Sequence, residues 1–428
     1  MEEAFFGKFV KKLPIVIITL YLLVTMCLYA FGPIKYTPNH PFLLYTYLLI
    51  SVLMLYIGFK YGIKKITSSA NIKNLLSIVK TNNDKERKLV RIFKFVLIIY
   101  LILIPLTLYS RTGSYIFNFQ SFKDLGEAYN SRVTLVTSNG RSMIEWARII
   151  LSPVIITYIP LGFICWKNIG KITKLLFILG FIGFVFIDLT CGTNKSLADA
   201  IIYSIVFGMV VIIKSISKMD ISIQRIKLKK KVWNIMIIGC LALIVFFIFF
   251  SSNILSRIGS KTNDYKTAYK YFASYLTQGY RAVDYSFDQP FESTFGFGSS
   301  MYLLDSTSEW FHTDYFLNRS YVIKNQNTFR LDYKLSWSSF YVWMANDISL
   351  LGVLLLMYLI GYIFGNAWGN ILVSMEFKSI IIFGLISQLC FYIPANNQIV
   401  QTPEALFGTA VWFLLWFLRS KRKRSVTL

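Results

Sequence analysis

Ten runs of mostly apolar residues alternate along the chain with shorter charged segments. A bilayer core about 30 Å thick is crossed by about 20 apolar residues of α-helix. The predicted spans are 13–31, 41–59, 92–109, 143–166, 174–190, 197–213, 232–250, 345–366, 377–393 and 403–418. We therefore expect an all-α polytopic membrane protein with about ten transmembrane helices, in which residues 1–428 form a single transmembrane domain.

The first apolar run is also compatible with a secretory signal peptide, because Lys8, Lys11 and Lys12 precede it. The run is long, however, and no small-residue cleavage site follows before Phe31-Gly-Pro33. This pattern favours a retained membrane anchor.

The charge pattern predicts the sidedness of the spans. Only 15% of the residues are charged, against roughly 25% in ordinary soluble domains, and the formal net charge is +24. With ten spans and both termini in the cytoplasm, 29 of the 45 Lys and Arg residues fall on the cytoplasmic side, with only 6 of the 21 Asp and Glu residues. Cytoplasmic loops of membrane proteins carry such a surplus, so the charge indicates topology and argues against a nucleic-acid partner.

The sequence predicts no metal or cofactor. Its five cysteines are an odd number within or beside apolar runs and have no zinc spacing, and its two histidines lie far apart. A divalent ion held by carboxylates alone stays open.

Two extracytoplasmic loops are predicted, at about 110–142 and 251–340. The second contains 21 aromatic, nine basic and eight acidic residues, and helical spacing of its aromatic residues near 265–283 predicts an amphipathic helix. Flat aromatic rings suit the apolar faces of sugars, although Tyr and Trp also collect at membrane surfaces for physical reasons. The arginines of this loop could bind phosphate groups, because the planar guanidinium forms two hydrogen bonds with one phosphate.

Charged residues near the spans all lie toward their predicted outer ends: Glu145, Arg148, Asp188, Lys195, Asp199, Asp347 and Glu404. This distribution favours a site open to the outer leaflet over an ion path through the membrane, but such side chains also reach water simply by snorkelling. Lys195 follows a glycine-containing turn at the start of a helix, where free N–H groups favour an anion. The alternative is that Lys195 is an ordinary loop residue with no role in binding.

Several segments resemble the outer-loop region of bacterial O-antigen and capsule repeat-unit polymerases. They are Tyr271-Phe-Ala-Ser-Tyr-Leu-Thr-Gln-Gly-Tyr-Arg281-Ala-Val-Asp284, Phe295-Gly-Phe-Gly298, Asn327-Thr-Phe-Arg330, Ser336-Trp-Ser-Ser-Phe340 and Asp347-Ile-Ser-Leu-Leu-Gly352. The family tends to enter its next span through a D-x-G-x-x-G-like sequence, and here Ile348-Ser-Leu replaces the first glycine. The turn Gly192-Thr-Asn-Lys195 resembles the basic turn of related polymerases and ligases, with Lys where Arg is usual.

The resemblance implies a GT-C-like bundle in a bacterial cytoplasmic membrane that joins undecaprenyl-pyrophosphate-linked oligosaccharides, as donor and acceptor, on the outer face. Membrane lipids, a chain-length regulator and a flippase are the further partners it suggests. Fixed cations would stabilise the pyrophosphate leaving group, and a base would accept the acceptor's proton. The predicted substrate-binding residues are Arg132, Arg141, Arg148, Lys195, Tyr280, Arg281 and Arg330. The predicted base is Asp284, on the helical face of Arg281, followed by Glu292 and His312; a structural role for Asp284, Lys195 or Arg281 stays open.

Other functions remain under consideration. One alternative is an O-antigen ligase or another membrane glycosyltransferase that uses a polyprenyl monophosphate sugar. A ligase of the related family would use an outer-loop histidine, which His312 could supply. A metal-assisted transferase is disfavoured because 32–40 contains no Asp or Glu. A transporter or flippase would need basic residues along a path through the bundle, and no matching pair of Gly- or Pro-broken spans is evident. A purely structural role for the protein would not explain the large aromatic loop with its paired charges.

Overall fold

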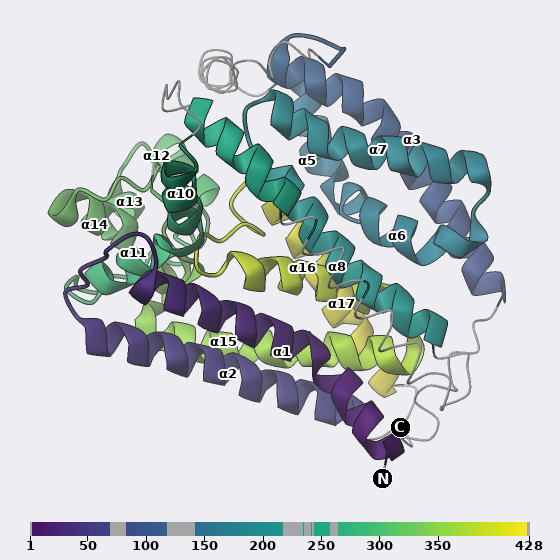
Figure 1. Ribbon diagram of the computed structural model, residues 1–428, viewed down its shortest axis with the longest axis horizontal. Coiled ribbons are helices and arrows are strands. Elements are labelled where there is room, and N and C mark those ends of the chain that lie inside the picture. The colour runs from purple at the N-terminus through teal and green to yellow at the C-terminus, as the bar shows by residue number, and fades with distance from the viewer. Residues whose placement is uncertain are drawn as a thin grey trace. The chain divides into compact units, whose positions relative to one another are not determined.

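Every regular element that the structure describes is a helix (Figure 1). The computed structural model describes residues 2–68, 83–117, 142–216, 234, 241, 244–256, 264–334 and 336–425. The helices are α1 (Glu2–Phe31), α2 (Pro41–Thr67), α3 (Asn83–Thr112), α5 (Met143–Ile155), α6 (Tyr158–Cys165), the 3₁₀ helix η3 (Trp166–Asn168), α7 (Lys171–Thr190), α8 (Lys195–Ile216), α10 (Tyr265–Thr277), α11 (Gly279–Ser286), α12 (Met301–Phe311), α13 (Tyr315–Arg319), α14 (Tyr321–Phe329), α15 (Phe340–Ser374), α16 (Phe377–Tyr392) and α17 (Pro403–Ser425).

Seven of the helical segments in the described ranges are long and apolar enough to cross a membrane. They are Phe9–Phe31, Pro41–Thr67, Glu86–Thr112, Met143–Asn168, Lys171–Thr190, Lys195–Ser215 and Phe340–Ser374. Each coincides with one predicted span. The shorter apolar helices Phe377–Tyr392 and Pro403–Leu418 coincide with two more. Of the predicted span 232–250, the structure describes residues 234, 241 and 244–250, and the last of these ranges begins the helix Ile244–Ser256. The all-helical, multi-pass prediction is confirmed, whereas the count of ten stays a prediction.

The chain divides into two compact units. Unit 1 comprises Met1–Leu75, Lys270–Thr409 and Arg419–Leu428, and unit 2 comprises Leu76–Tyr269 and Ala410–Leu418. The single-domain organisation expected from the sequence stays a prediction.

Polar contacts at its two ends define unit 2 as an antiparallel bundle. At one end, Glu86 near the start of α3 accepts a 2.9 Å hydrogen bond from Asn168 at the end of η3 and lies 3.0 Å from Lys214 near the end of α8. At the other end, Arg111 of α3 forms an ion pair with Asp188 of α7. Successive spans therefore run in alternating directions, as the predicted topology requires.

In unit 1, α2 and α15 pack through glycines that bring their backbones together (Figure 1). A Cβ atom added at Gly58, Gly62, Gly361 or Gly365 would lie only 2.0–2.1 Å from a carbonyl oxygen of the facing helix. Both helices thus carry the G-x-x-x-G spacing that allows close packing of membrane helices. Gly58 faces Tyr358 and Gly62 faces Tyr362, so the two helices run parallel.

A break at Ser349 divides α15 into two helices. Ser349 has φ 66° and ψ 163°, a conformation that is essentially restricted to glycine and costs of order 1–3 kcal/mol for other residues. The segment after the break, about 25 residues, is long enough to cross a bilayer at about 1.5 Å per residue. The Ser349 Oγ accepts a hydrogen bond from the Gly352 N–H at 3.3 Å and so caps the second helix.

Residues 279–339, which contain α11–α14, form a helical lobe on the ends of α2 and α15. Ser300 begins α12 and Ser320 begins α14 by accepting hydrogen bonds from the N–H groups of Leu303 and Ile323, each at 3.4 Å. The lobe confirms that the predicted loop is partly helical, since four short helices fall within 251–340 in addition to α10.

We predict that Ser349→Gly stabilises the protein by about 1 kcal/mol, because glycine adopts this backbone conformation without strain and costs only a few tenths as a cap. Ser349→Ala should instead lose about 1 kcal/mol, since it keeps the strain and loses the cap. Thermal unfolding of the purified protein in detergent measures both. Equal melting temperatures for the two variants would contradict the assignment of strain to this position.

Gly62→Ala and Gly361→Ala should each destabilise the protein by about 1–3 kcal/mol, because the added methyl group forces the α2 and α15 backbones apart. The same unfolding assay measures the change. Gly170→Ser is the control, since a Cβ at Gly170 meets no atom within 4 Å and serine is a favourable N-cap for α7. Wild-type stability of both alanine variants would show that the close approach does not hold the pair together.

Candidate functional site

Two polar residues of α15 fasten the lobe to the membrane-spanning helices. The Asp347 carboxylate accepts hydrogen bonds from the N–H groups of Gly296 at 2.8 Å and Gly298 at 3.1 Å. The neighbouring Asn346 is fully buried, donates to the Gly298 carbonyl at 2.8 Å and accepts from the Tyr321 N–H at 2.8 Å. The loop at 294–298 and the start of α14 are thereby fixed to one turn of α15.

Asp284 of α11 fastens the lobe to the start of α2. Its carboxylate is fully buried and accepts hydrogen bonds from the backbone N–H groups of Asn39 at 2.6 Å and His40 at 2.9 Å. These N–H groups lie at the helix N-terminus, where a negative charge is favoured. In this conformation, Asp284 is closed off from any substrate, and its partners are main-chain groups and not Arg281.

Asp288, one turn beyond Asp284, extends the same attachment to the surface. Its carboxylate lies 2.6 Å from His40 Nε2, and it also accepts a 3.2 Å hydrogen bond from the Asn39 side chain. Because a carboxylate can only accept, His40 Nε2 is the donor. The hydrogen bond from His40, followed by that from Asn39, lowers the pKa of Asp288 below its ordinary value of 3.8.

Arg281 is an exposed cation held by an aromatic stack. Its Nε donates a 2.8 Å hydrogen bond to the Tyr285 hydroxyl, and its guanidinium lies 5.1 Å from the centre of that ring. Tyr285 stacks on Phe329 with ring centroids 4.2 Å apart. Arg330, which is also exposed, follows Phe329 directly and has a left-handed backbone with φ 56°. The lobe thus brings α11 and the end of α14, with the two predicted arginines, together.

Arg319, which was not among the predicted site residues, is held in a similar way. Its guanidinium lies 5.5 Å from the ring centre of Phe295 and 4.9 Å from that of Tyr315. Its Nε donates to the Ser293 carbonyl at 2.8 Å, and its Nη1 donates to the Tyr315 hydroxyl at 2.8 Å. The spacing of Tyr315 and Arg319, four residues apart on one helix, is the signal that could have found this pair.

The other predicted residues of the lobe differ in exposure. Tyr280 is buried and shares a 2.8 Å hydrogen bond with Thr25 of α1. Glu292 is exposed and lies 3.5 Å from the Lys324 ammonium. His312 is exposed at the end of α12, in a left-handed conformation with φ 49°. Glu292 and His312 are therefore open to a ligand, whereas Tyr280 packs inside unit 1.

A polar cluster in unit 2 contains the predicted substrate-binding residue Lys195. Lys195 forms an ion pair of 2.7 Å with the buried Asp199, one turn along α8. Asp188 pairs with Arg111, which was not predicted, and accepts a hydrogen bond from Ser196. Asn253 donates a hydrogen bond to the Gly192 carbonyl at 2.9 Å and so holds the turn that precedes Lys195. Lys195 is thus already paired with an acid.

Arg148 lies on α5 of unit 2 and is partly exposed. Arg132 and Arg141 lie outside the described residues. Among the residues that the structure describes, no group of three or more His, Cys, Asp or Glu side chains is arranged to hold a metal ion.

Burial shifts the pKa of one further carboxyl group in the lobe, that of Asp305. Asp305 of α12 accepts a 2.8 Å hydrogen bond from the Tyr333 hydroxyl. Burial raises the pKa of Asp305 above its ordinary value despite this bond. The pair joins α12 to the segment after α14 and contributes to the scaffold of the lobe.

Comparison with known proteins gives no relative. No family model matches the chain, and neither a curated protein nor a solved structure is significantly similar to it.

The contact between His40 and Asp288 predicts a pH-dependent contribution to stability. Because the pKa of Asp288 is lower in the folded protein, the contribution is complete above the ordinary value of 3.8 and is lost as the pH falls through the folded value. We expect Asp288→Asn to cost about 0.5 kcal/mol at neutral pH, as the loss of an exposed pair does, and the difference from wild type to shrink as the pH falls below 3.8. Melting temperatures measured across this range test it.

Asp314→Asn is the matched control for this measurement, because the Asp314 carboxylate makes no hydrogen bond or ion pair with the described residues. A difference between Asp288→Asn and wild type that persists unchanged in acid would contradict the proposed ionic contribution.

Proposed function

We propose that this protein is a glycosyltransferase that polymerises oligosaccharide repeat units carried on undecaprenyl pyrophosphate. In this proposal, the lobe lies on the outer face of a bacterial cytoplasmic membrane and both termini lie in the cytoplasm. The growing glycan is transferred to the non-reducing end of a new lipid-linked repeat unit, and undecaprenyl pyrophosphate is released.

The observation that carries the proposal is the joining of two segments that resemble the polymerase family. Asp347 accepts hydrogen bonds from Gly296 and Gly298, which unites Phe295-Gly-Phe-Gly298 with Asp347-Ile-Ser-Leu-Leu-Gly352. Aligning the latter with D-x-G-x-x-G puts Ser349 at the first glycine, and Ser349 has the backbone conformation that glycine favours. Ser349 therefore departs from the family's pattern in its side chain, while its own backbone has a conformation that suits glycine.

The arginines of the lobe, exposed at Arg281 and Arg330 and partly exposed at Arg319, suit the chemistry. Cleavage of the bond between the sugar C1 and the phosphate oxygen moves negative charge onto the pyrophosphate, and fixed cations lower that barrier without reorganising. Arg281 is oriented by Tyr285 through one ring contact and one hydrogen bond, which leaves further N–H groups of its fork to bind phosphate oxygens. Arg330 and Arg319 supply additional positive charge on the same lobe.

The base in this proposal is Glu292 or His312. Both side chains are exposed on the lobe, whereas the buried Asp284 already accepts two main-chain hydrogen bonds. A general base has to come within hydrogen-bonding distance of the acceptor hydroxyl. We assign Asp284 the role of positioning α11, and with it Arg281.

The topology is proposed together with the function. If the chain forms ten spans in a GT-C-like bundle and its N-terminus is cytoplasmic, α2 and α15 both begin on the outer side. The parallel packing of these two helices agrees with that assignment. The lobe attaches at their starting ends, through Asn39, His40, Asn346 and Asp347, so it would face outward.

Deletion of the gene in its host, followed by separation of the surface and lipid-linked glycans by gel and mass spectrometry, tests the function. We expect loss of the polymer ladder while single repeat units still reach the surface. Arg281→Ala should reduce the polymer about 100-fold at normal protein level, as loss of one charge-stabilising donor does elsewhere. Arg281→Lys should restore only part, because lysine lacks the planar fork.

Lys266→Ala is the control for Arg281→Ala, since Lys266 is an exposed cation of α10 that lies outside the proposed site. Long chains accumulating on the lipid carrier after deletion would instead indicate a ligase, for which the exposed His312 is the residue to replace. Single units trapped on the inner leaflet would indicate a flippase. Either result would overturn the polymerase assignment.

A further inference from the structure

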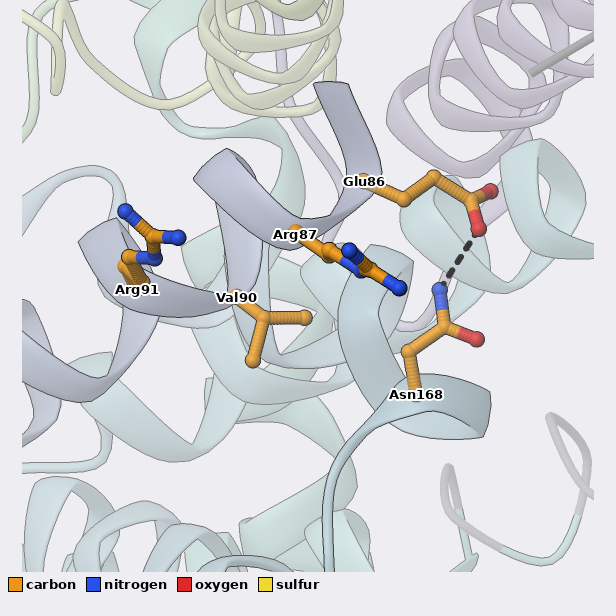
Figure 2. A pocket seen from close by; sticks show the side chains of 5 residues that line it. All are labelled: Glu86, Arg87, Val90, Arg91 and Asn168. Carbon is orange, nitrogen blue, oxygen red and sulfur yellow. Dashed lines mark hydrogen bonds between the residues drawn. The ribbon is translucent and has the colours of Figure 1, made fainter. Parts of the chain in front are cut away.

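A cavity of about 370 Å³ opens at the end of unit 2 where α3 begins. It is lined by Glu86, Arg87, Val90, Arg91 and Asn168 (Figure 2). This volume falls in the ~300–1,000 Å³ range of small-ligand sites. The cavity lies at the start of one span and the end of another, and therefore at the level of the membrane surface.

The cavity carries unbalanced positive charge. Glu86 is engaged by the Asn168 amide at 2.9 Å and by Lys214 at 3.0 Å. Arg87 and Arg91 lie on successive turns of α3, with Val90 between them in Figure 2, and both are exposed. Neither arginine has a hydrogen-bond or ion-pair partner within the described ranges. Two guanidinium groups at one opening select an anion, and their forks suit the oxygens of a phosphate.

An apolar stripe continues from these arginines along α3. Phe95, Ile98 and Ile102 follow Arg87 and Arg91 at spacings of three and four residues, so all five lie on one helical face. The three apolar side chains are 57–63% exposed. From Arg91 to Ile102 the helix rises about 16 Å, which is roughly half of the ~30 Å hydrocarbon core. Two cations followed by an apolar surface as long as one leaflet is deep fit the phosphate and the acyl chains of a phospholipid. A free anion would use only the cations.

We propose that the cavity binds the phosphate headgroup of an anionic phospholipid, whose acyl chains lie along Phe95, Ile98 and Ile102. The phosphate oxygens accept hydrogen bonds from Arg87 and Arg91, while Lys214 compensates Glu86. On the topology proposed above, this end faces the cytoplasmic leaflet, whose surface is negatively charged. The proposal requires the chain to span the membrane, but it does not depend on glycosyl transfer.

Native mass spectrometry of the full chain in detergent, incubated with equal amounts of phosphatidylglycerol and phosphatidylcholine of the same acyl length, tests the proposal. We expect selective retention of phosphatidylglycerol. The double variant Arg87→Gln/Arg91→Gln should weaken that retention about 30-fold, at about 1 kcal/mol for each arginine near the surface. Millimolar inorganic phosphate should not displace the lipid, because it lacks the apolar contacts.

The double variant Lys88→Gln/Lys94→Gln is the matched control. It removes the same charge from exposed positions of α3 that do not line the cavity, and it should retain the lipid as the wild type does. Val90→Phe narrows the cavity and keeps both arginines, and it should weaken retention of the lipid. It replaces the arginine variant as the test if that variant does not fold.

Three results would overturn the proposal. Equal losses in the lysine and arginine variants would indicate general surface attraction. Displacement by inorganic phosphate alone would indicate a site for a free anion. Unchanged retention in Val90→Phe would show that the headgroup does not lie in the cavity.

Discussion

The close approach of α2 and α15 is the contact on which the rest of unit 1 depends. In a bilayer, apolar helices gain little by leaving the lipid, so their pairing relies on packing, and glycine lets two backbones meet. Gly58 and Gly62 on one helix and Gly361 and Gly365 on the other bring the carbonyl oxygens into the contact. Because the pair is parallel, the beginnings of both helices lie together and form one platform.

The platform explains how two acidic residues, the buried Asp284 and the partly exposed Asp347, hold the lobe. Asp284 accepts from the main chain at the start of α2, and Asp347 at the start of α15 accepts from the main chain of the 294–298 loop. A carboxylate that receives two or more N–H groups is well compensated for the loss of water, and each such bond contributes roughly 1.5–3 kcal/mol. The lobe is thus fixed at two points, and the position of Arg281 follows from that of Asp284, one helical turn away.

The sequence predicted helices well because membrane spans depend on local composition, and each apolar run in the described ranges forms a helix. It did not predict the site in full, because contacts between distant segments carry no local signature. The pattern of Arg281 and Asp284, three residues apart, suggested a pair on one face, yet the nearest groups that can satisfy Asp284 are the N–H groups of Asn39 and His40, about 245 residues away. Arg319 shows only half of its setting in the sequence: the spacing to Tyr315 is visible there, whereas its other aromatic partner, Phe295, comes from another segment. The break at Ser349 was visible only as a departure from a family pattern.

The partners of the cations separate those that hold the structure from those available for chemistry. Lys195 is exposed but pairs with the buried Asp199, and the largely buried Arg111 pairs with Asp188. A buried carboxylate without such a partner would be costly. The charge of both cations is thereby neutralised. Arg281 and Arg319 are instead oriented by tyrosine hydroxyls, aromatic rings and a main-chain carbonyl, and these partners restrict the side chain without cancelling its charge. In the proposed reaction, a fixed cation that keeps its charge would stabilise the departing pyrophosphate, which makes the lobe the stronger candidate for the site of that proposed reaction.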